Sequence, residues 1–207
     1  MTLDLSFSMP VIWAGSYLAG SIPAGVVFSR LLRGVDVRRQ GSGNIGSANV
    51  FRVAGPGPAA ATLAFDCVKG FVPVFIAQSL GLPLWALLVT GVFAVIGHNW
   101  SIFLRGRGGK GIATSVGVLA GIAPMVTLIA LAVWIVVILG SRYASLASLL
   151  MMASVPVMLA LLGYTDPYLI FGASLVVLAI YRHRTNIGRL WSGTELKITA
   201  GAVGRGG

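Results

Sequence analysis

The sequence contains the apolar stretch I-A-T-S-V-G-V-L-A-G-I-A-P-M-V-T-L-I-A-L-A-V-W-I-V-V-I-L-G at residues 112–140, which has no charged residue. As one straight helix it would be about 44 Å long, whereas the hydrocarbon core of a bilayer is about 30 Å thick. Pro124, preceded by Gly121, offers a break near its first third. We therefore predict two helical segments, 112–122 and 125–140. The first is too short to cross a bilayer, so we expect it to end partway through or beside a cavity.

Five further apolar stretches indicate membrane helices, namely Pro10–Leu32, Ala59–Leu80, Leu84–Leu104, Leu146–Leu162 and Tyr168–Tyr181. Hydrophobic residues make up 57% of the 207 residues and charged residues only 10%, against about 25% charged in soluble domains. A soluble protein of this length could not bury so much apolar surface. The composition excludes a water-soluble enzyme. It predicts an all-α polytopic membrane protein, a compact bundle of seven helical segments, some of them short or half-spanning.

The basic residues predict the orientation of the bundle. The chain has 15 Lys and Arg against 5 Asp and Glu, a formal net charge of +10. With seven segments, an outside N-terminus and an inside C-terminus, nearly all basic residues lie inside, as the positive-inside rule requires. If 112–140 were a single span, the basic segment 182–189 would lie outside. We further expect residues 1–198 to form one domain and the glycine-rich residues 199–207 to form a flexible tail.

Three polar segments on the predicted inner side combine glycines, basic residues and amides or hydroxyls. They are G-S-G-N-I-G-S-A-N-V-F-R at 41–52, G-H-N-W-S-I-F-L-R-G-R-G-G-K-G-I-A-T at 97–114, and R-H-R-T-N-I-G-R at 182–189. Glycine allows backbone N–H groups to converge on an anion, and a helix beginning near Ser47 would point its N-terminus at the same place. Turn formation and topology are the alternative roles. Together the segments predict one composite phosphate pocket at the inner surface.

Two nucleotide-binding patterns are matched only in part. Residues 41–46 fit G-x-G-x-x-G, but membrane spans surround them in place of a βαβ unit. Residues 104–111 resemble the end of a P-loop, but Leu104 stands where the first glycine is required, and Gly111 replaces the hydroxyl residue that binds magnesium. An ATP or dinucleotide site is therefore not expected.

Several charged residues and both histidines lie within the predicted spans or directly after them. Asp66 and Lys69, three residues apart in one span, either pair with each other or face a polar cavity, and their role, catalytic or structural, stays open. We interpret His98 as a structural hydrogen-bonding residue. His183 and Asn186 are three residues apart and would share one helix face.

These motifs resemble those of the PlsY family, the bacterial integral-membrane acyl-phosphate:glycerol-3-phosphate acyltransferases. The resemblance covers 41–52, D-C-V-K-G at 66–70, 97–114, S-R-Y-A-S-L-A-S at 141–148 and Y-R-H-R-T-N-I-G-R-L at 181–190, and it departs at Ser101, where proline is expected. It implies transfer of a fatty acyl group from acyl-phosphate to the 1-hydroxyl of glycerol 3-phosphate. The products would be lysophosphatidic acid and inorganic phosphate, for phospholipid biosynthesis. The implied location is the bacterial inner membrane with a cytoplasmic active site, in contact with membrane lipid and without cofactor, metal or nucleic acid.

The resemblance also implies roles for individual residues. Arg52 and Lys110 should bind phosphate, while His183 and Asn186 should lie close to glycerol 3-phosphate. The candidate catalytic residues are Ser42, Lys110, His183 and Asn186. The candidate substrate-binding residues are Arg52, Lys110, Gly43, Asn44, Asn49, Gly108, Gly109, Gly111, Thr114 and Ser148. The proton of the substrate hydroxyl goes either to His183 or to a substrate phosphate, and we favour the phosphate. A transporter of a phosphorylated metabolite is the alternative function, although the outer turns are nearly featureless.

Overall fold

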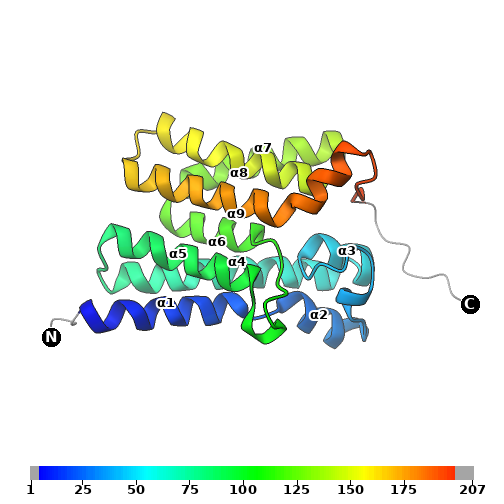
Figure 1. Ribbon diagram of the computed structural model, residues 1–207, viewed down its shortest axis with the longest axis horizontal. Coiled ribbons are helices and arrows are strands. Elements are labelled where there is room, and N and C mark those ends of the chain that lie inside the picture. The colour runs from blue at the N-terminus through cyan, green and yellow to red at the C-terminus, as the bar shows by residue number, and fades with distance from the viewer. Residues whose placement is uncertain (1–4, 199–207) are drawn as a thin grey trace, which may run out of the picture.

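A computed structural model of the protein describes residues 5–198, and the predicted tail 199–207 lies outside the described residues. Figure 1 shows the long helices lying side by side, with the α4–α5 and α8–α9 turns at one end and α3 at the other. Within the described residues the chain forms two short 3₁₀ helices, η1 (Val37–Arg39) and η2 (Ile102–Leu104), and nine α-helices: α1 (Leu5–Ser21), α2 (Ala24–Arg33), α3 (Ser47–Ala54), α4 (Pro56–Ser79), α5 (Leu84–Asn99), α6 (Ile112–Ile122), α7 (Pro124–Ser141), α8 (Ala144–Leu161) and α9 (Asp166–Trp191).

The break predicted within 112–140 is present. Helix α6 ends at Ile122 and α7 begins at Pro124, with Ala123 between them. Pro124 occupies the first position of α7, where its missing N–H costs no hydrogen bond. Helix α6 packs mainly against α4. A Cβ at Gly117 would overlap the carbonyl oxygen of Cys67, so only glycine permits this close approach.

The first predicted span differs from the expectation, because it consists of two helices. Helix α1 ends at Ser21 and α2 begins at Ala24. Pro23 lies between them and has no backbone N–H to continue a helical ladder. The Ile22 carbonyl accepts from the Ala24 N–H at 3.0 Å and from Lys69 Nζ of α4 at 2.7 Å. A buried cation thus stabilises the break.

The last helix is longer than predicted. We expected a span over Tyr168–Tyr181, but α9 continues to Trp191 and includes the third polar segment. The chain then turns back toward the start of α8, where the Ile198 N–H donates to the Arg142 carbonyl at 2.7 Å. Membrane crossing and site residues therefore share one continuous helix.

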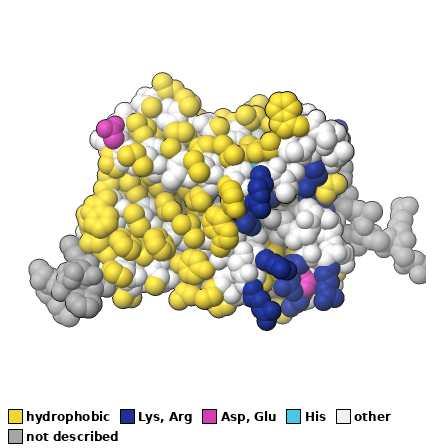
Figure 2. All heavy atoms as spheres, viewed as in Figure 1, with side chains coloured by type: hydrophobic (Ala, Val, Ile, Leu, Met, Phe, Trp, Pro, Cys, Tyr) yellow, Lys and Arg dark blue, Asp and Glu magenta, His cyan; other side chains and the backbone are white. Residues whose placement is uncertain are grey.

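The molecule is multi-pass and polarised in charge. Within residues 5–198, five segments are long and apolar enough to cross a membrane: Met9–Arg33, Pro56–Ser79, Leu84–Leu104, Pro124–Ser141 and Ala144–Leu161. Figure 2 shows Lys and Arg gathered toward the end of the bundle that carries α3, while the other end of this face is largely hydrophobic. Such a distribution suits a protein that crosses the bilayer and presents one basic end to water.

Candidate active site

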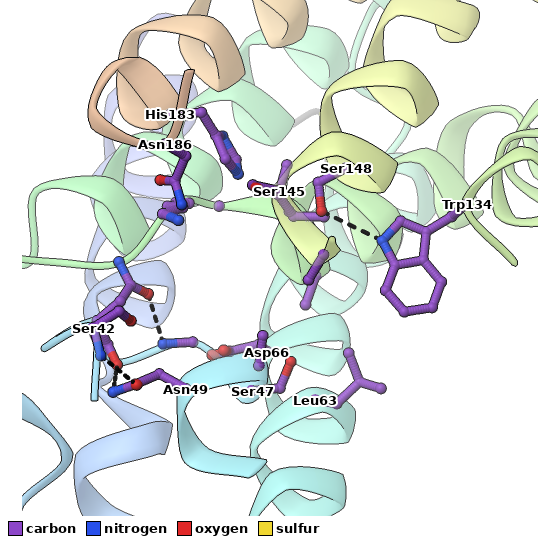
Figure 3. Close-up of a pocket in the computed structure, with 18 of the residues that line it drawn as sticks. Ser42, Ser47, Asn49, Leu63, Asp66, Trp134, Ser145, Ser148, His183 and Asn186 are labelled. Carbon is purple, nitrogen blue, oxygen red and sulfur yellow. Dashed lines mark hydrogen bonds between the residues drawn. The ribbon is translucent and has the colours of Figure 1, made fainter. Parts of the chain in front are cut away.

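A cavity of about 380 Å³ lies at the basic end of the bundle, between α3, α4 and α6 on one side and α7, α8 and α9 on the other (Figure 3). All three polar segments contribute to its wall. Its polar lining includes Ser42, Ser47, Asn44, Asn49, Arg52, Lys110, Gly111, Ser145, Ser148, His183, Asn186 and Arg189. Its apolar lining includes Leu63, Ile112, Val116, Leu131, Trp134 and Met151.

Asn49 of α3 organises the first polar segment. Its Oδ1 accepts from the Ser42 N–H at 2.8 Å, and its Nδ2 donates to the Asn44 carbonyl at 2.8 Å and the Val37 carbonyl at 3.0 Å. Asn44 in turn accepts from the Gly46 N–H at 2.9 Å. These bonds hold the loop closed around the buried Asn49 and keep Ser42 at the cavity wall.

Arg52 and Lys110 are two of the cations that border the cavity, and they come from different polar segments. Arg52 of α3 donates through Nη2 to the Leu196 carbonyl at 2.9 Å and through Nε to the Lys197 carbonyl at 3.2 Å. Since a guanidinium has five N–H donors, several remain for an anion. Lys110 precedes α6 and has no ion-pair partner within 4.0 Å among residues 5–198. Burial disfavours the charged ammonium and lowers the pKa of Lys110 to about 8. The positive charges of Arg189 and Arg52 act in the same direction, whereas the negative charge of Glu195 opposes the shift.

His183 and Asn186 lie on one face of α9, as predicted, and both are buried. Nδ1 of His183 is 2.8 Å from the Ala179 carbonyl. A carbonyl only accepts, so Nδ1 carries the proton and Nε2 is left as an acceptor. Asn186 donates from Nδ2 to Glu195 at 2.6 Å, while its Oδ1 has no hydrogen-bond partner in the described part of the chain. Figure 3 shows both side chains beside Ser145.

Comparison with known proteins shows to which family the chain belongs. The family model for glycerol-3-phosphate acyltransferases matches residues 10–193. A glycerol-3-phosphate acyltransferase of Desulforudis audaxviator is 47% identical over 184 residues, covering 89% of this chain and 92% of the relative. One of Geotalea daltonii is 43% identical over 185 residues, covering 89% and 95%. The chain belongs to the glycerol-3-phosphate acyltransferase family.

Solved structures of another family member have the same fold. The glycerol 3-phosphate form of PlsY, an integral membrane glycerol 3-phosphate acyltransferase, superposes with a TM-score of 0.88 at 39% identity and covers 93% of this chain and 96% of that one. The lysophosphatidic acid form of the same protein gives a TM-score of 0.86 with equal identity and coverage. The resemblance read from the motifs is confirmed.

Four of the binding residues predicted for the present chain do not line the cavity, namely Gly43, Gly108, Gly109 and Thr114. Thr114 is fully buried in α6, where the Gly70 backbone of α4 packs against its own backbone. The Gly109 N–H donates to the His98 carbonyl at 2.9 Å. Ser148 does reach the wall and accepts from Trp134 Nε1 at 3.3 Å (Figure 3). Substrate contact by these four residues stays a prediction.

Glu195, which follows α9, was not predicted as part of the site. Its carboxylate, 4% exposed, accepts from Ser145 at 2.8 Å, Asn186 at 2.6 Å and Arg189 at 2.7 Å. Burial disfavours its ionised form, but these three hydrogen bonds outweigh burial and hold the pKa of Glu195 below its usual value. The one feature of the sequence that could have drawn attention to this residue is that Glu195 is the only glutamate.

Asp66 and Lys69 form the charged pair of α4, which lies next to the same cavity. Asp66 Oδ1 lies 2.7 Å from Lys69 Nζ and 3.6 Å from His98 Nδ1, and all three side chains are nearly inaccessible. The predicted ion pair is confirmed, and Asp66 and His98 also border the cavity. The two residues therefore pair with each other, and only Asp66 of the two borders the cavity.

Proposed function

We propose that this protein transfers a fatty acyl group from acyl-phosphate to the 1-hydroxyl of glycerol 3-phosphate, giving lysophosphatidic acid and inorganic phosphate. The observation that carries the proposal is a single cavity with a cationic polar end and an apolar wall. The reaction needs both, because one substrate is a small phosphate ester and the other has a long hydrocarbon chain. The names of the relatives and the ligands of the solved PlsY forms support the same reaction.

The acceptor substrate is assigned to the cationic end. Lys110 and Arg52 bind the phosphate of glycerol 3-phosphate, since both border the cavity and the Lys110 ammonium has no carboxylate partner among the described residues. Charge-assisted hydrogen bonds to a phosphate are stronger than those between neutral groups. His183 and Asn186 then lie within the same enclosure as the glycerol hydroxyls.

The fatty acyl chain of the donor is assigned to the apolar wall. Leu63 comes from α4, Leu131 and Trp134 from α7, and Met151 from α8. All three helices are apolar enough to cross a membrane. A hydrocarbon chain can therefore reach the cavity while remaining largely in an apolar environment.

The reaction requires the protein to orient the substrate hydroxyl, whereas acid catalysis matters less because phosphate is a good leaving group. The 1-hydroxyl oxygen attacks the acyl carbonyl carbon, the bond from that carbon to the phosphate oxygen breaks, and inorganic phosphate leaves. Ser42 and Asn186 border the cavity, and we assign to them the stabilisation of the carbonyl oxygen as it gains charge. The hydroxyl proton goes to a phosphate oxygen of a substrate, whose second pKa is about 6.

The proposal includes the location of the protein. Residues 1–198 form the acyltransferase domain, which resides in the bacterial inner membrane with its N-terminus outside and its cavity facing the cytoplasm. The grouping of Arg and Lys toward the end that carries α3 supports this orientation. Nothing in the relatives' names or in the solved PlsY forms supports transport of a metabolite.

The test is acyl transfer by detergent-purified protein. Palmitoyl-phosphate with glycerol 3-phosphate should give equal amounts of lysophosphatidic acid and inorganic phosphate, and palmitoyl-CoA should give no product. Arg52→Ala and Lys110→Ala should each lose about 1.5–3 kcal/mol of charge-assisted bonding, seen in kcat/KM for glycerol 3-phosphate. Arg33→Ala is the control, because Arg33 is exposed and lies outside the cavity. Turnover with palmitoyl-CoA would contradict the proposed donor.

A further inference from the structure

Arg182 of α9 binds the glycine loop that precedes Lys110. Its Nε donates to the Gly109 carbonyl at 2.8 Å and its Nη2 donates to the Gly108 carbonyl at 2.9 Å. The guanidinium is a planar fork, so one side chain can make both bonds at once. Arg182 does not border the cavity, and its contact with the site runs through this backbone.

The position of Arg182 is itself fixed. Its guanidinium lies over the Trp100 ring, 5.3 Å from the centroid. Trp100 in turn packs near Tyr181 of α9, with ring centroids 6.0 Å apart. An arginine held against an aromatic ring loses less conformational freedom when it forms its hydrogen bonds.

The opposite side of the glycine loop rests on the end of α5. The Gly109 N–H donates to the His98 carbonyl at 2.9 Å. A Cβ at Gly108 would overlap that carbonyl oxygen, and a Cβ at Gly109 would overlap the His98 ring. The loop is thus held between α5 and Arg182, and both positions require glycine because the backbone approaches so closely.

This arrangement determines where Lys110 lies. The peptide unit between Gly109 and Lys110 is trans and planar. Its plane contains both the Gly109 carbonyl that Arg182 holds and the Lys110 Cα, from which the side chain starts. No carboxylate among the described residues forms an ion pair with the Lys110 ammonium. The backbone of the loop therefore sets the start of the lysine side chain, and Arg182 sets the backbone.

We propose that Arg182 is a positioning residue for phosphate binding, which acts by fixing the Gly108–Gly109 backbone from which Lys110 reaches the phosphate of glycerol 3-phosphate. The inference rests on the proposed function for the identity of the ligand. A role through positive charge alone predicts a different result, because lysine supplies the same charge without a planar pair of donors.

The experiment compares four purified proteins: wild type, Arg182→Gln, Arg182→Lys and Arg184→Gln. Arg184 is the matched control, because it is also a cation of α9 but is exposed and donates only within its own helix, to the Tyr181 carbonyl. Isothermal titration with glycerol 3-phosphate gives Kd without requiring turnover. Acyl transfer on the same preparations judges the proposed function separately, and thermal unfolding shows whether each variant is folded.

Arg182→Gln and Arg182→Lys should both raise Kd by about 10-fold or more, as expected for losing charge-assisted bonds that order a binding loop. Arg184→Gln should bind as wild type. In turnover, KM for glycerol 3-phosphate should rise with the Kd while kcat changes less than about threefold. A wild-type Kd in Arg182→Lys would show that charge alone suffices and would overturn the proposal, as would a wild-type Kd in Arg182→Gln.

Discussion

Lys110 is predicted to give the protein a pH-dependent affinity for its phosphate substrate. Burial lowers the pKa of Lys110 to about 8, so the lysine loses its proton and its charge as the pH rises through that value. We expect kcat/KM for glycerol 3-phosphate to fall above about pH 8, because kcat/KM reports ionisations of the free enzyme. Lys110→Arg should move the fall to higher pH, since a guanidinium stays charged.

The measurement is a series of initial rates over about three pH units upward from neutrality, so that the range includes the fall above about pH 8. Lys197→Arg serves as the control, because Lys197 is exposed and lies over the Tyr143 ring, outside the cavity. An identical high-pH limb in Lys110→Arg and wild type would show that another group is responsible.

His183 is predicted to orient the substrate and not to act as the base. Its Nδ1 donates to the Ala179 carbonyl, which leaves Nε2 to accept from a glycerol hydroxyl. The ring is buried in the same cavity wall as Lys110 and Arg189, where a further positive charge is unfavourable. His183→Gln should therefore weaken glycerol 3-phosphate binding, retain much of kcat and keep the rise of kcat with pH. A fall in kcat of about 10²–10⁴ with loss of that rise would identify His183 as the base.

Part of the site could be predicted from single residues, and part could not. The glycine-rich basic segments predicted a phosphate pocket, the family resemblance implied roles in it for Ser42, Arg52, Lys110, His183 and Asn186, and all five reach the cavity wall. Glu195 was missed because its role depends on the chain turning back after α9, which no local pattern reveals. Its three hydrogen-bond donors come from two different helices.

At the scale of elements, the Asp66–Lys69 pair is predicted to stabilise α4 within the bundle. Their charged atoms are 2.7 Å apart and almost inaccessible, and Lys69 also binds the carbonyl at the α1–α2 break. Removing one partner of a buried pair costs about 3–5 kcal/mol, because the other charge is left unpaired. Lys69→Met should lower the unfolding temperature strongly, and Asp66→Asn with Lys69→Met should restore part of it.

Unfolding in detergent, followed by tryptophan fluorescence, provides the measurement. Lys197→Met is the matched control, since the same substitution at an exposed position should leave the transition unchanged. A double variant as unstable as Lys69→Met alone would show that the ion pair is not the source of the effect.

The elements that apolar length and proline determine were predicted well. The α6–α7 break follows from a run too long for one span together with Pro124. The α1–α2 break was missed although Pro23 is visible, because the apolar run continues through it and its length fits one span. The end of α9 was predicted too early, since residues 182–189 are polar and resemble a flank, yet a helix can continue beyond the bilayer when its face packs on the protein.

At the scale of the whole molecule, the orientation in the membrane is the prediction to test. In a Cys67→Ser background, which removes the only cysteine, Thr165→Cys should react with an impermeant thiol reagent added to intact cells. Arg107→Cys and Arg184→Cys should react only after the cells are opened. Thr165 is exposed at the α8–α9 turn and, unlike Gly81, is not in the left-handed region. Outside labelling at position 184 would contradict the odd number of crossings that an outside N-terminus and an inside C-terminus require.

The return of the chain after α9 has a consequence for how the protein matures. Glu195 binds Ser145, Asn186 and Arg189, and the carbonyls of residues 196 and 197 bind Arg52. A ribosome makes the chain from its N-terminus, so helices α1 to α9 have been synthesised before these contacts can form. A nascent chain in the membrane therefore holds an open, incompletely neutralised pocket. The enzyme gains its finished site only when residues 195–197 have been made and have folded back.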